Sequence, residues 1–528
     1  MTLLVTPAEM RAAEQAAIAA GRSSASLILA AGRAIAAWID ESVCGTHSTA
    51  SENSSGRHAV ALVGPGNNGG DALVALGLLS ERGWHVSAVL LSRSEFGPLP
   101  IPAELLEAVE VRELDVLRTA TLVLDGVYGI SGRETLCADV IAAIQAACDA
   151  RANNGTFLVA LDVPSGINAE SGAAGEQAFR ADATLCLGLP KIGMVREPAA
   201  SHVGELVLLD IGVDAATIAA EARRPRMLTS RDMRPLLPRR AASSHKSDAG
   251  TLLIVAGAPT YYGAPRLCGA AAMRVGAGLV ALAAPAAIVP TIAGAIPELV
   301  MIPLPSDTEG SIDAIERFVS ERSSTLRAVV IGPGLGGGER VDEMLEMLLG
   351  NASVTEPLTR LAQLSHVIDA DGLNWIARRG CWPEKLQPGT AVFTPHAGEL
   401  ARLLDVNVQA VRDEPWETVR QAARESGQVV VLKLGYTAVA SPEGGLWIAP
   451  RAMPEMATAG TGDVLAGTIG GFLAQGIPPL DAARLAVYVG SQAGSHASRR
   501  FGKLSVIAGD IIDMLPESLS RLASPYAP

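Results

Sequence analysis

The stretch AGTGDVLAG, residues 459–467, sets glycines around one acidic residue and runs directly into an apolar segment typical of a helix. Gly460 and Gly462 let backbone amides face a ligand, and the amino end of a helix favours negative charge there. Asp463 would then lie within reach of a hydroxyl that attacks a phosphoryl group, so we expect it to act as a general base. No GK[ST] follows the glycines, which excludes a Walker loop. The alternative is that Asp463 only caps a helix over residues 464–475.

Length and composition indicate a folded enzyme of several domains. A chain of 528 residues exceeds one hydrophobic core, and 49% hydrophobic with 18% charged residues is typical of globular proteins. The net charge of −13 argues against a nucleic-acid partner, because phosphate contacts need clustered Lys and Arg. The six cysteines never form CxxC, so neither a disulfide framework nor a zinc site is expected. No secretory signal or membrane-spanning run is evident, and we expect a cytoplasmic enzyme.

Apolar, strand-like runs alternate with alanine-rich helical stretches along the chain. This alternation predicts parallel sheets with helices on both faces. Residues 221–250 break the pattern with Arg and Pro, as a solvated connection would, although a basic binding tail is the alternative reading. We therefore predict an α/β protein of two three-layer domains, residues 1–222 and 223–528.

In the first half, polar residues follow the ends of three predicted strands. VGPGNNGGDALVALGLL (63–79) reads as a strand, a glycine turn and a helix, with two asparagines and Asp71 in the turn. Asp125 ends the strand in LVLDGVYGISGR, and Asp162 with Ser165 ends the strand in LVALDVPSGIN. Ligands of open α/β sheets bind beyond the carboxyl ends of strands, so these groups are expected in one cleft. Each Asp alone could instead cap a helix.

Together, GPGNNGGDALV, LDGVYGISGR and LDVPSGIN resemble the fingerprints of the NAD(P)HX epimerase family, which has a Rossmann-like fold. The resemblance covers roughly residues 1–220. It implies that Asp162 is the acid/base candidate and contacts the hydrated nicotinamide nucleotide. It also implies a K⁺ site at Asn68, Asp125 and Ser165. The remaining implied contacts to the hydrated nucleotide are Asn67, Asn68, Gly69, Gly70, Asp71, Gly129, Ile130, Ser131, Gly132, Arg133, Glu134 and Thr135.

The second half resembles the ribokinase-like superfamily, and within it the ADP/ATP-dependent NAD(P)HX dehydratases. The motifs that carry this resemblance are IGPGLG (331–336), DADGLN (369–374), TPHAGELARLL (394–404) and MATAGTGDVLAGTIGGFLAQG (456–476). The match extends over roughly residues 228–515. It implies that the hydrated nucleotide contacts Ala264, Gly336, His396 and Asp463. It implies that the adenine nucleotide is held by Lys433, Leu434, Gly435, Tyr436, Thr437 and Gly462.

Two residues of this half carry a further argument. His396 could be a core or capping residue, but its place at a strand end before Gly398 and Glu399 favours a ligand contact. Lys433 closes the apolar run VVVLK, where a charge is costly to bury unless a phosphate or another anion pairs with it. The sequence departs from the family pattern at Leu434, which stands where glycine is usual and could crowd the nucleotide. SHKSDAG likewise lacks the glycine often found after its lysine.

The resemblance implies a bifunctional enzyme of metabolite repair. The first domain, an isomerase, would interconvert the R and S hydrates of NADH or NADPH through ring-opened or iminium chemistry. The second, a lyase, would phosphorylate the hydroxyl of the S hydrate with Asp463 as base and then lose phosphate. ADP, giving AMP, is the expected donor, with ATP as the alternative, and Mg²⁺ would bridge the donor phosphates. The expected partners are these small molecules, neither nucleic acid nor membrane, and a homo-oligomer is compatible with the sequence.

Two other functions stay open at this point. A vitamin-precursor kinase of the ribokinase-like group would use the same Asp463 loop and release a stable phosphate ester. The TPHAGE motif and the additional first domain argue against it. Alternatively, one half is a degenerate binding scaffold, as Leu434 would suggest for the second half. The intact polar strand ends argue against a scaffold.

Overall fold

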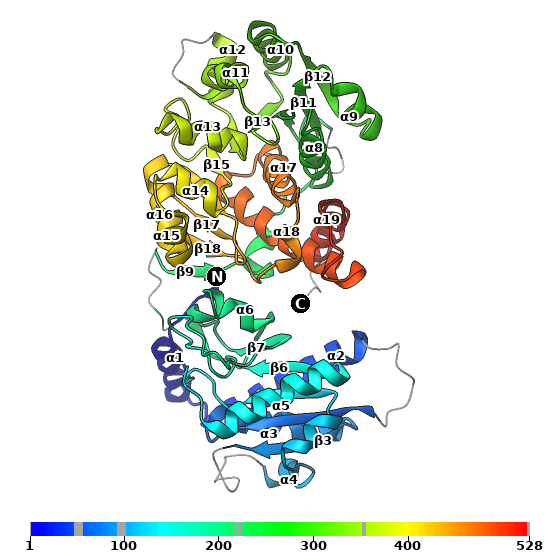
Figure 1. Ribbon diagram of the computed structural model, residues 1–528, viewed down its shortest axis with the longest axis vertical. Coiled ribbons are helices and arrows are strands. Elements are labelled where there is room, and N and C mark those ends of the chain that lie inside the picture. The colour runs from blue at the N-terminus through cyan, green and yellow to red at the C-terminus, as the bar shows by residue number, and fades with distance from the viewer. Residues whose placement is uncertain are drawn as a thin grey trace. The chain divides into compact units, whose positions relative to one another are not determined.

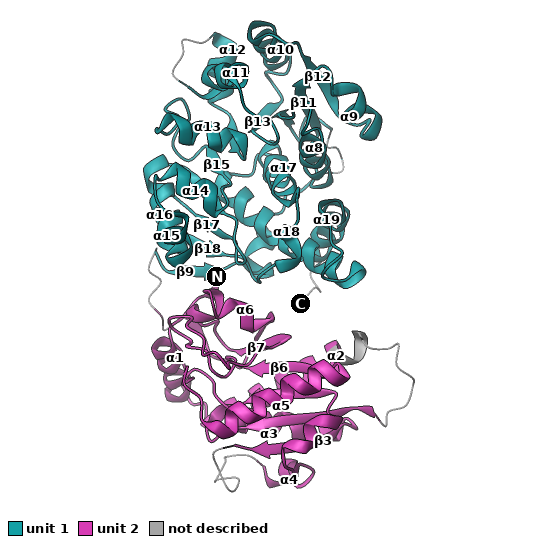
Figure 2. Cartoon of the chain, viewed as in Figure 1, with its two compact units in different colours: residues 1, 222–528 teal, residues 2–221 magenta. Residues whose placement is uncertain are grey.

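The computed structural model of the chain describes residues 2–46, 56–91, 102–132, 134–215, 218, 223–241, 243, 245–350 and 355–524 (Figure 1). The chain divides into two compact units, residues 2–221 and residues 222–528 together with residue 1 (Figure 2). The sequence predicts a domain boundary between residues 222 and 223. Residues 219–222, directly before that boundary, lie outside the described residues. Each unit has a sheet between helices.

A parallel sheet in the order β4-β3-β2-β5-β6-β7-β8 forms the centre of the first unit. Every residue of β2, β5 and β7 is buried, as expected for strands covered on both faces. The strands are β2 (His58–Val63), β3 (His85–Leu90), β4 (Glu110–Val111), β5 (Leu122–Gly126), β6 (Phe157–Leu161), β7 (Ala183–Leu187) and β8 (Glu205–Leu209), and a short β1 (Thr2–Leu3) begins the chain.

Successive residues of β2 point into two different hydrophobic clusters. Ala59, Ala61 and Val63 pack with α2 and α3, whereas Val60 and Leu62 pack with α5 and η2. The first unit is therefore a three-layer sandwich. Its helices are α1 (Pro7–Ala19), α2 (Ser24–Thr46), α3 (Asn67–Glu81), α4 (Ala103–Glu107), η2 (Leu114–Thr119), α5 (Ala138–Asn154), η3 (Ile192–Val195) and α6 (Ala200–Val203).

The strand order of the first unit reverses between β2 and β5, because β3 and β4 extend the sheet on one side and β5 to β8 on the other. At this switch point the turn from β2 into α3 lies directly on the loop after β5. A Cβ added to Gly64 would lie 2.0 Å from the carbonyl oxygen of Val127, so only glycine fits there. The crevice at such a switch point is where open α/β sheets bind ligands.

The sheet of the second unit runs in the order β9-β18-β17-β16-β15-β14-β13-β10-β11-β12. Neighbouring strands are parallel, except that β17 is antiparallel to both β16 and β18. The strand order reverses between β10 and β13. The strands are β9 (Pro225–Met227), β10 (Thr251–Val255), β11 (Leu279–Pro285), β12 (Val300–Leu304), β13 (Leu326–Ile331), β14 (Ser365–Ile368), β15 (Ala391–Phe393), β16 (Val429–Leu432), β17 (Ala438–Ala440) and β18 (Leu446–Ile448).

Four helices, α8, α17, α18 and α19, share one large hydrophobic cluster with alternate residues of the sheet, such as Leu252 and Ile254. Figure 1 shows α8 and α17 side by side on this face. The helices of the unit are α7 (Ser230–Met233), η5 (Arg234–Leu236), α8 (Gly263–Arg274), α9 (Val289–Ala295), α10 (Thr308–Glu321), α11 (Glu339–Leu349), α12 (Glu356–Ala362), α13 (Asp371–Arg379), α14 (Ala397–Leu403), α15 (Val408–Asp413), α16 (Pro415–Ser426), η6 (Pro454–Met456), α17 (Thr461–Ala474), α18 (Pro479–Phe501) and α19 (Ala508–Ala523).

Glycines hold α17 close to its neighbours, which fixes where its amino end lies. A Cβ on Gly467 would lie 2.1 Å from the carbonyl oxygen of Cys268 in α8, and one on Gly471 would lie 2.7 Å from that of Ala272. The two backbones therefore touch, and no side chain fits between them. In the described part of the chain, no helix has both the length and the apolar content needed to cross a bilayer.

We predict that Gly467→Ala lowers the free energy of unfolding of the second unit by about 1–3 kcal/mol, because the added methyl group forces α8 and α17 apart. Denaturant unfolding monitored by circular dichroism would measure the change. Gly509→Ala in α19 is the matched control, since a Cβ there meets no atom within 4 Å. The control is expected to change stability by no more than about 1 kcal/mol, in the stabilising direction. Equal stability of the two variants would contradict the tight packing.

Candidate active sites

Asp463 lies in the first turn of α17, which begins at Thr461 and not near Val464 as the sequence suggested. The helix starts earlier because Gly460 adopts φ +91°, a conformation that glycine accepts readily. Gly460 is the N-cap, and no side chain caps the helix. Asp463 is therefore not the cap, and the first-turn amides are available to an anion.

Lys433 follows β16 and lies in an ion-pair cluster beside this helix end. Its Nζ is 2.8 Å from Oδ1 of Asp369 and 3.8 Å from Oε2 of Glu399. Asp369, almost fully buried after β14, also accepts a hydrogen bond of 2.8 Å from Oγ1 of Thr394. Burial lowers the pKa of Lys433, but the charges of Asp369 and Glu399 outweigh it, so that the pKa is raised overall. Lys433 is therefore a permanent cation at the site.

The carboxyl group of Asp463 has a pKa raised to about 7. Burial is the largest cause, and the negative charges of Asp369 and Asp371 add to it, while Lys433 acts in the opposite direction. A carboxyl group with a pKa close to the working pH is ionised often enough to accept a proton and basic enough to hold it. Asp463 thus has the acidity that a general base needs.

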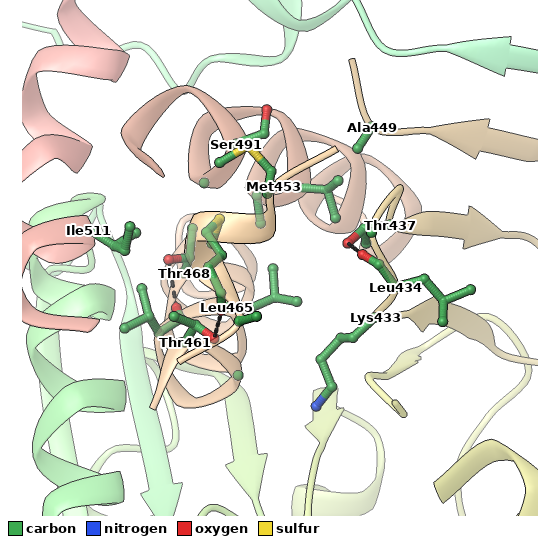
Figure 3. Close-up of a pocket in the computed structure, with 18 of the residues that line it drawn as sticks. Lys433, Leu434, Thr437, Ala449, Met453, Thr461, Leu465, Thr468, Ser491 and Ile511 are labelled. Carbon is green, nitrogen blue, oxygen red and sulfur yellow. Dashed lines mark hydrogen bonds between the residues drawn. The ribbon is translucent and has the colours of Figure 1, made fainter. Parts of the chain in front are cut away.

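An apolar pocket of about 320 Å³ lies between the β16–β17 loop, η6 and helices α17 to α19 (Figure 3). Met453, Met456 and Leu465 contribute to its wall. Its size and lining suit a flat heterocyclic base, with Lys433 at one edge to meet a phosphate. Of the predicted nucleotide contacts, those that line the pocket are Lys433, Leu434, Gly435, Thr437 and Gly462.

Tyr436 and Leu434 differ from the other predicted nucleotide contacts in how their side chains lie relative to the pocket. Tyr436 is buried, with 5% exposure, and is not among the residues that line the pocket. Leu434 lines the pocket, but Figure 3 shows its side chain directed away from Met453 and Leu465. The Leu434 side chain therefore does not extend toward these two residues.

His396 is both a helix cap and an accessible side chain. Its Nδ1 accepts hydrogen bonds from the amides of Gly398, at 3.0 Å, and Glu399, at 3.3 Å, at the start of α14. The proton of the neutral ring is therefore on Nε2. The side chain is 54% exposed, and burial together with the charges of Lys433 and Arg402 lowers its pKa. His396 can thus donate a hydrogen bond to a ligand while it holds the helix end.

Ala264, at the start of α8, and Gly336, in the loop after β13, lie near the switch point of the second sheet. Ala264 is in the first turn of α8, and Gly334 approaches it so closely that a Cβ there would lie 3.0 Å from the Ala264 Cβ. The amide of Gly336, which has φ +72°, donates a hydrogen bond of 2.8 Å to Oδ2 of Asp371. These residues follow β10 and β13, at the same edge of the sheet as Asp369.

In the first unit, a pocket of about 660 Å³ opens at the switch point between α1, α2, α3 and the loop after β5. Of the predicted contacts to the hydrated nucleotide, Gly69, Gly70, Gly132 and Glu134 are not among its lining residues, and Arg133 lies outside the described residues. The predicted residues that do line it are Asn67, Asn68, Asp71, Gly129, Ile130, Ser131, Thr135 and Asp162.

Asp162 forms a buried ion pair with Lys191, which the sequence analysis did not single out. Lys191 is fully buried; burial lowers its pKa, but the charge of Asp162 outweighs this and the pKa is raised overall. Asp162 has φ +65°, a strained conformation for a residue other than glycine. The amide of Leu187, 3.2 Å from Oδ1, also holds its carboxylate. The pair holds the carboxylate of Asp162 in place at the pocket wall.

Of the predicted cation ligands, Asn68 lines the pocket, whereas Asp125 and Ser165 are fully buried and are not among its lining residues. Oδ1 of Asp125 accepts a hydrogen bond of 2.7 Å from Oγ of Ser165. The side-chain amide of Asn68 donates to the carbonyl oxygens of Tyr128 and Leu161, each at 3.0 Å. Its buried Oδ1 has no hydrogen-bond partner among the described residues. Burial raises the pKa of Asp125 to about 6, against the hydrogen bonds from Ser165 and Val127. An uncompensated amide oxygen and a buried carboxyl group are oxygen ligands that a hard cation can use.

Comparison with known proteins places the chain in a family. A family model described as NAD(P)H-hydrate dehydratase matches residues 252–517, and one described as YjeF-related protein N-terminus matches residues 24–193. The bifunctional NAD(P)H-hydrate repair enzyme Nnr of Moorella thermoacetica is 35% identical over 487 residues, which cover 88% of each chain. The chain belongs to the family of bifunctional NAD(P)H-hydrate repair enzymes. The family and the α/β fold class predicted from the sequence are both confirmed.

The chain is also similar to the following relative and solved structure. The enzyme of the same name from Escherichia coli is 31% identical over 477 residues, covering 89% of this chain and 85% of its own. A solved ADP/ATP-dependent NAD(P)H-hydrate dehydratase from Bacillus subtilis, co-crystallised with ATP and Mg²⁺, is 29% identical with a TM-score of 0.48. It covers 58% of this chain and 100% of its own.

We predict that Asp463→Asn stabilises the second unit by about 1–3 kcal/mol at pH 8 but not at pH 4. The folded state holds the Asp463 proton up to a pKa of about 7, whereas the unfolded chain releases it near pH 4. The protonated carboxyl group therefore contributes stability that is lost as the pH rises from about 4 to about 7.

Urea unfolding of both proteins at pH 4 and pH 8 would measure this. Asp513→Asn, an exposed position in α19, is the control and should stay within about 0.5 kcal/mol at both pH values. The raised pKa of Asp463 would be contradicted if the difference in unfolding free energy between Asp463→Asn and the parent were the same at pH 4 and pH 8.

Proposed function

We propose that the chain repairs hydrated NADH and NADPH in two steps. Residues 1–222 interconvert the R and S hydrates, and residues 223–528 dehydrate the S form at the expense of ADP, with AMP and phosphate as the other products. Membership of the bifunctional family supports this. The observation that carries it is Asp463, with a pKa near 7, at the uncapped amino end of a helix beside a cationic Lys433.

In the dehydration step, each of the residues at the site has a distinct role. Asp463 removes the proton of the hydroxyl group on the hydrated ring, and that oxygen attacks the terminal phosphoryl group of the donor. The first-turn amides of α17 and the ammonium group of Lys433 stabilise the charge that develops on the phosphoryl oxygens. Phosphate then leaves the ring more readily than hydroxide would, pushed out by the lone pair of the ring nitrogen. Ala264, Gly336 and His396 orient the hydrated nucleotide.

The apolar pocket beside Lys433 holds the adenine of the donor, with contacts from the loop 433–437 and Gly462. Glycine at position 462 leaves room for a phosphate next to Lys433. A Cβ added to Gly462 would lie 3.4 Å from the Lys433 ammonium group, in the space that the phosphate needs. Among the described residues, no three carboxylate, histidine or cysteine groups come together as a metal site. Mg²⁺ therefore fits as an ion carried by the donor phosphates, whose charge it neutralises.

In the first unit, Asp162 is the base that moves protons during epimerisation, since its carboxylate lines the pocket and is paired with Lys191. Asn68, Asp125 and Ser165 hold K⁺, and the buried Oδ1 of Asn68, which has no partner among the described residues, supports this ligand set. Bound by these residues, the cation would supply positive charge beside the buried carboxyl group of Asp125.

We predict that the purified chain converts a mixture of R- and S-NADHX completely to NADH when Mg²⁺, K⁺ and ADP are present. The absorbance band of the reduced nicotinamide would report the reaction, with ATP in a parallel run. Asp463→Asn should lower kcat of dehydration by about 10²–10⁴-fold without impairing epimerisation. A stable phosphorylated product in place of released phosphate would instead identify a small-molecule kinase.

The rate of dehydration is expected to depend on pH through Asp463. Because only the ionised carboxylate can accept the proton, kcat should rise as the pH increases through about 7 and then level off. Single-turnover measurements between pH 5.5 and pH 9 would give the profile. A rate that is constant between pH 6 and pH 8 would argue against Asp463 as the base.

We also predict that Asp125→Asn weakens the response of epimerisation to K⁺. Loss of the negative charge removes the main attraction for the cation, so half-maximal activation should need at least about tenfold more K⁺. Titration of epimerase activity with KCl, at constant ionic strength set by a tetraalkylammonium salt, would show the shift. Identical titrations for parent and variant would exclude this cation site.

A further inference from the structure

We propose that Asp71 is a second catalytic residue of the first unit, a neutral acid that protonates the ring nitrogen while Asp162 takes the hydroxyl proton. This inference rests on the epimerase activity proposed above. In this proposal one carboxyl group acts as the acid and the other as the base, and the two come from different elements that line the same pocket.

Asp71 reaches the pocket from α3. It lies one helical turn after Asn67 and Asn68, so that all three are near one face of the helix, and all three line the pocket. The residue is only 7% exposed. Within the described residues, no group donates a hydrogen bond or forms an ion pair with its carboxyl group. A buried carboxyl group that nothing in the fold compensates points to a group that meets a ligand.

The surroundings of Asp71 and Asp162 differ in their cationic neighbours. Lys191 pairs directly with Asp162. Asp71 has no such cation; burial raises its pKa well above the ordinary value, the charges of Asp162 and Glu14 raise it further, and Lys191 only partly opposes them. Arg11 and Glu14 of α1 are the other charged groups that line the pocket. Two carboxyl groups in one site whose environments differ in this way are suited to opposite roles.

This pair matches what epimerisation of the substrate requires. The hydrated ring carries its hydroxyl group on the carbon next to the ring nitrogen. Asp162 takes the hydroxyl proton, the oxygen forms a carbonyl, and the electrons of the carbon–nitrogen bond pass to the nitrogen, which takes the proton of Asp71. The ring is then open, with Asp162 protonated and Asp71 ionised, so no proton or electron is lost.

The same two groups close the ring on the opposite face. Rotation about the adjacent carbon–carbon bond presents the other side of the carbonyl to the nitrogen. As the nitrogen attacks, it returns its proton to Asp71, and the carbonyl oxygen recovers its proton from Asp162. The pair ends in its starting state, so that the enzyme catalyses both directions without any other reactant.

The test compares the full-length chain with Asp71→Asn and with Glu81→Gln, a matched removal of an exposed carboxylate at the far end of the same helix. Interconversion of purified R-NADHX and S-NADHX is followed by chromatography in the presence of K⁺ and without ADP. For each protein, kcat and KM are measured between pH 5.5 and pH 9. Dehydration of S-NADHX by the second unit and urea unfolding at pH 8 report whether the variant is folded.

Asp71→Asn is expected to lower kcat of epimerisation at least about 100-fold with KM changed by no more than about threefold, because the amide still fits but has no proton to give. The parent should lose activity as the pH rises through the pKa of Asp71, and any activity left in the variant should lack this alkaline decline. The variant should dehydrate S-NADHX normally and be no less stable than the parent, since it removes a carboxyl group that resists ionisation. Glu81→Gln should match the parent throughout.

A kcat within threefold of the parent, or an increase in KM alone, would overturn the role of Asp71 and leave the proposed epimerase activity intact. An unchanged alkaline decline in Asp71→Asn would overturn it as well. If the parent chain itself does not interconvert the hydrates, the proposed function of the first unit fails, and this inference fails with it.

Discussion

Both sites depend on an ion pair between an aspartate and a lysine that follows a strand of the sheet, the lysine being fully buried in the first unit and partly buried in the second. In the first unit Lys191 pairs with Asp162, and in the second Lys433 pairs with Asp369. Withdrawal of a lone ammonium group from water is strongly unfavourable, so each lysine requires its carboxylate. The pair in turn fixes the charge that neighbouring groups experience. Asp463 owes part of its raised pKa to Asp369, and Asp71 owes part of its own to Asp162.

The sheets and their polar strand ends could be predicted from the sequence, because buried parallel strands are continuous apolar runs that end in Gly, Asn or Asp. Asn67, Asn68, Asp71 and Asp162 line one pocket, as their positions after successive strands suggested. The reason is topological. All carboxyl ends of a parallel sheet lie at one edge, so a residue after one strand is close to a residue after the next.

Other features of the two sites could not be predicted from the sequence. Lys191 is a single lysine in the run GLPKIG, and nothing local shows that its side chain turns inward to Asp162. In the sequence Asp369 stands out only as part of the DADGLN motif. Its ion pair with Lys433 could not be predicted, because the two residues are 64 positions apart in the chain. The predicted start of α17, near Val464, was wrong. Gly460 adopts a left-handed conformation, and the helix therefore begins at the next residue, Thr461. Such features depend on long-range contacts and on single backbone angles.

The pocket beside Lys433 takes much of its apolar wall from the thioethers of Met453 and Met456, both partly accessible to solvent. Methionine adapts its shape to a flat base, yet an oxidant converts it to a sulfoxide that is polar and bulkier. Oxidation at these two positions would place dipoles in the pocket that we propose for the adenine. The repair of damaged reduced nicotinamide would therefore weaken under the same oxidising conditions that drain the reduced pool, and would recover only once methionine sulfoxide reductases had restored the thioethers.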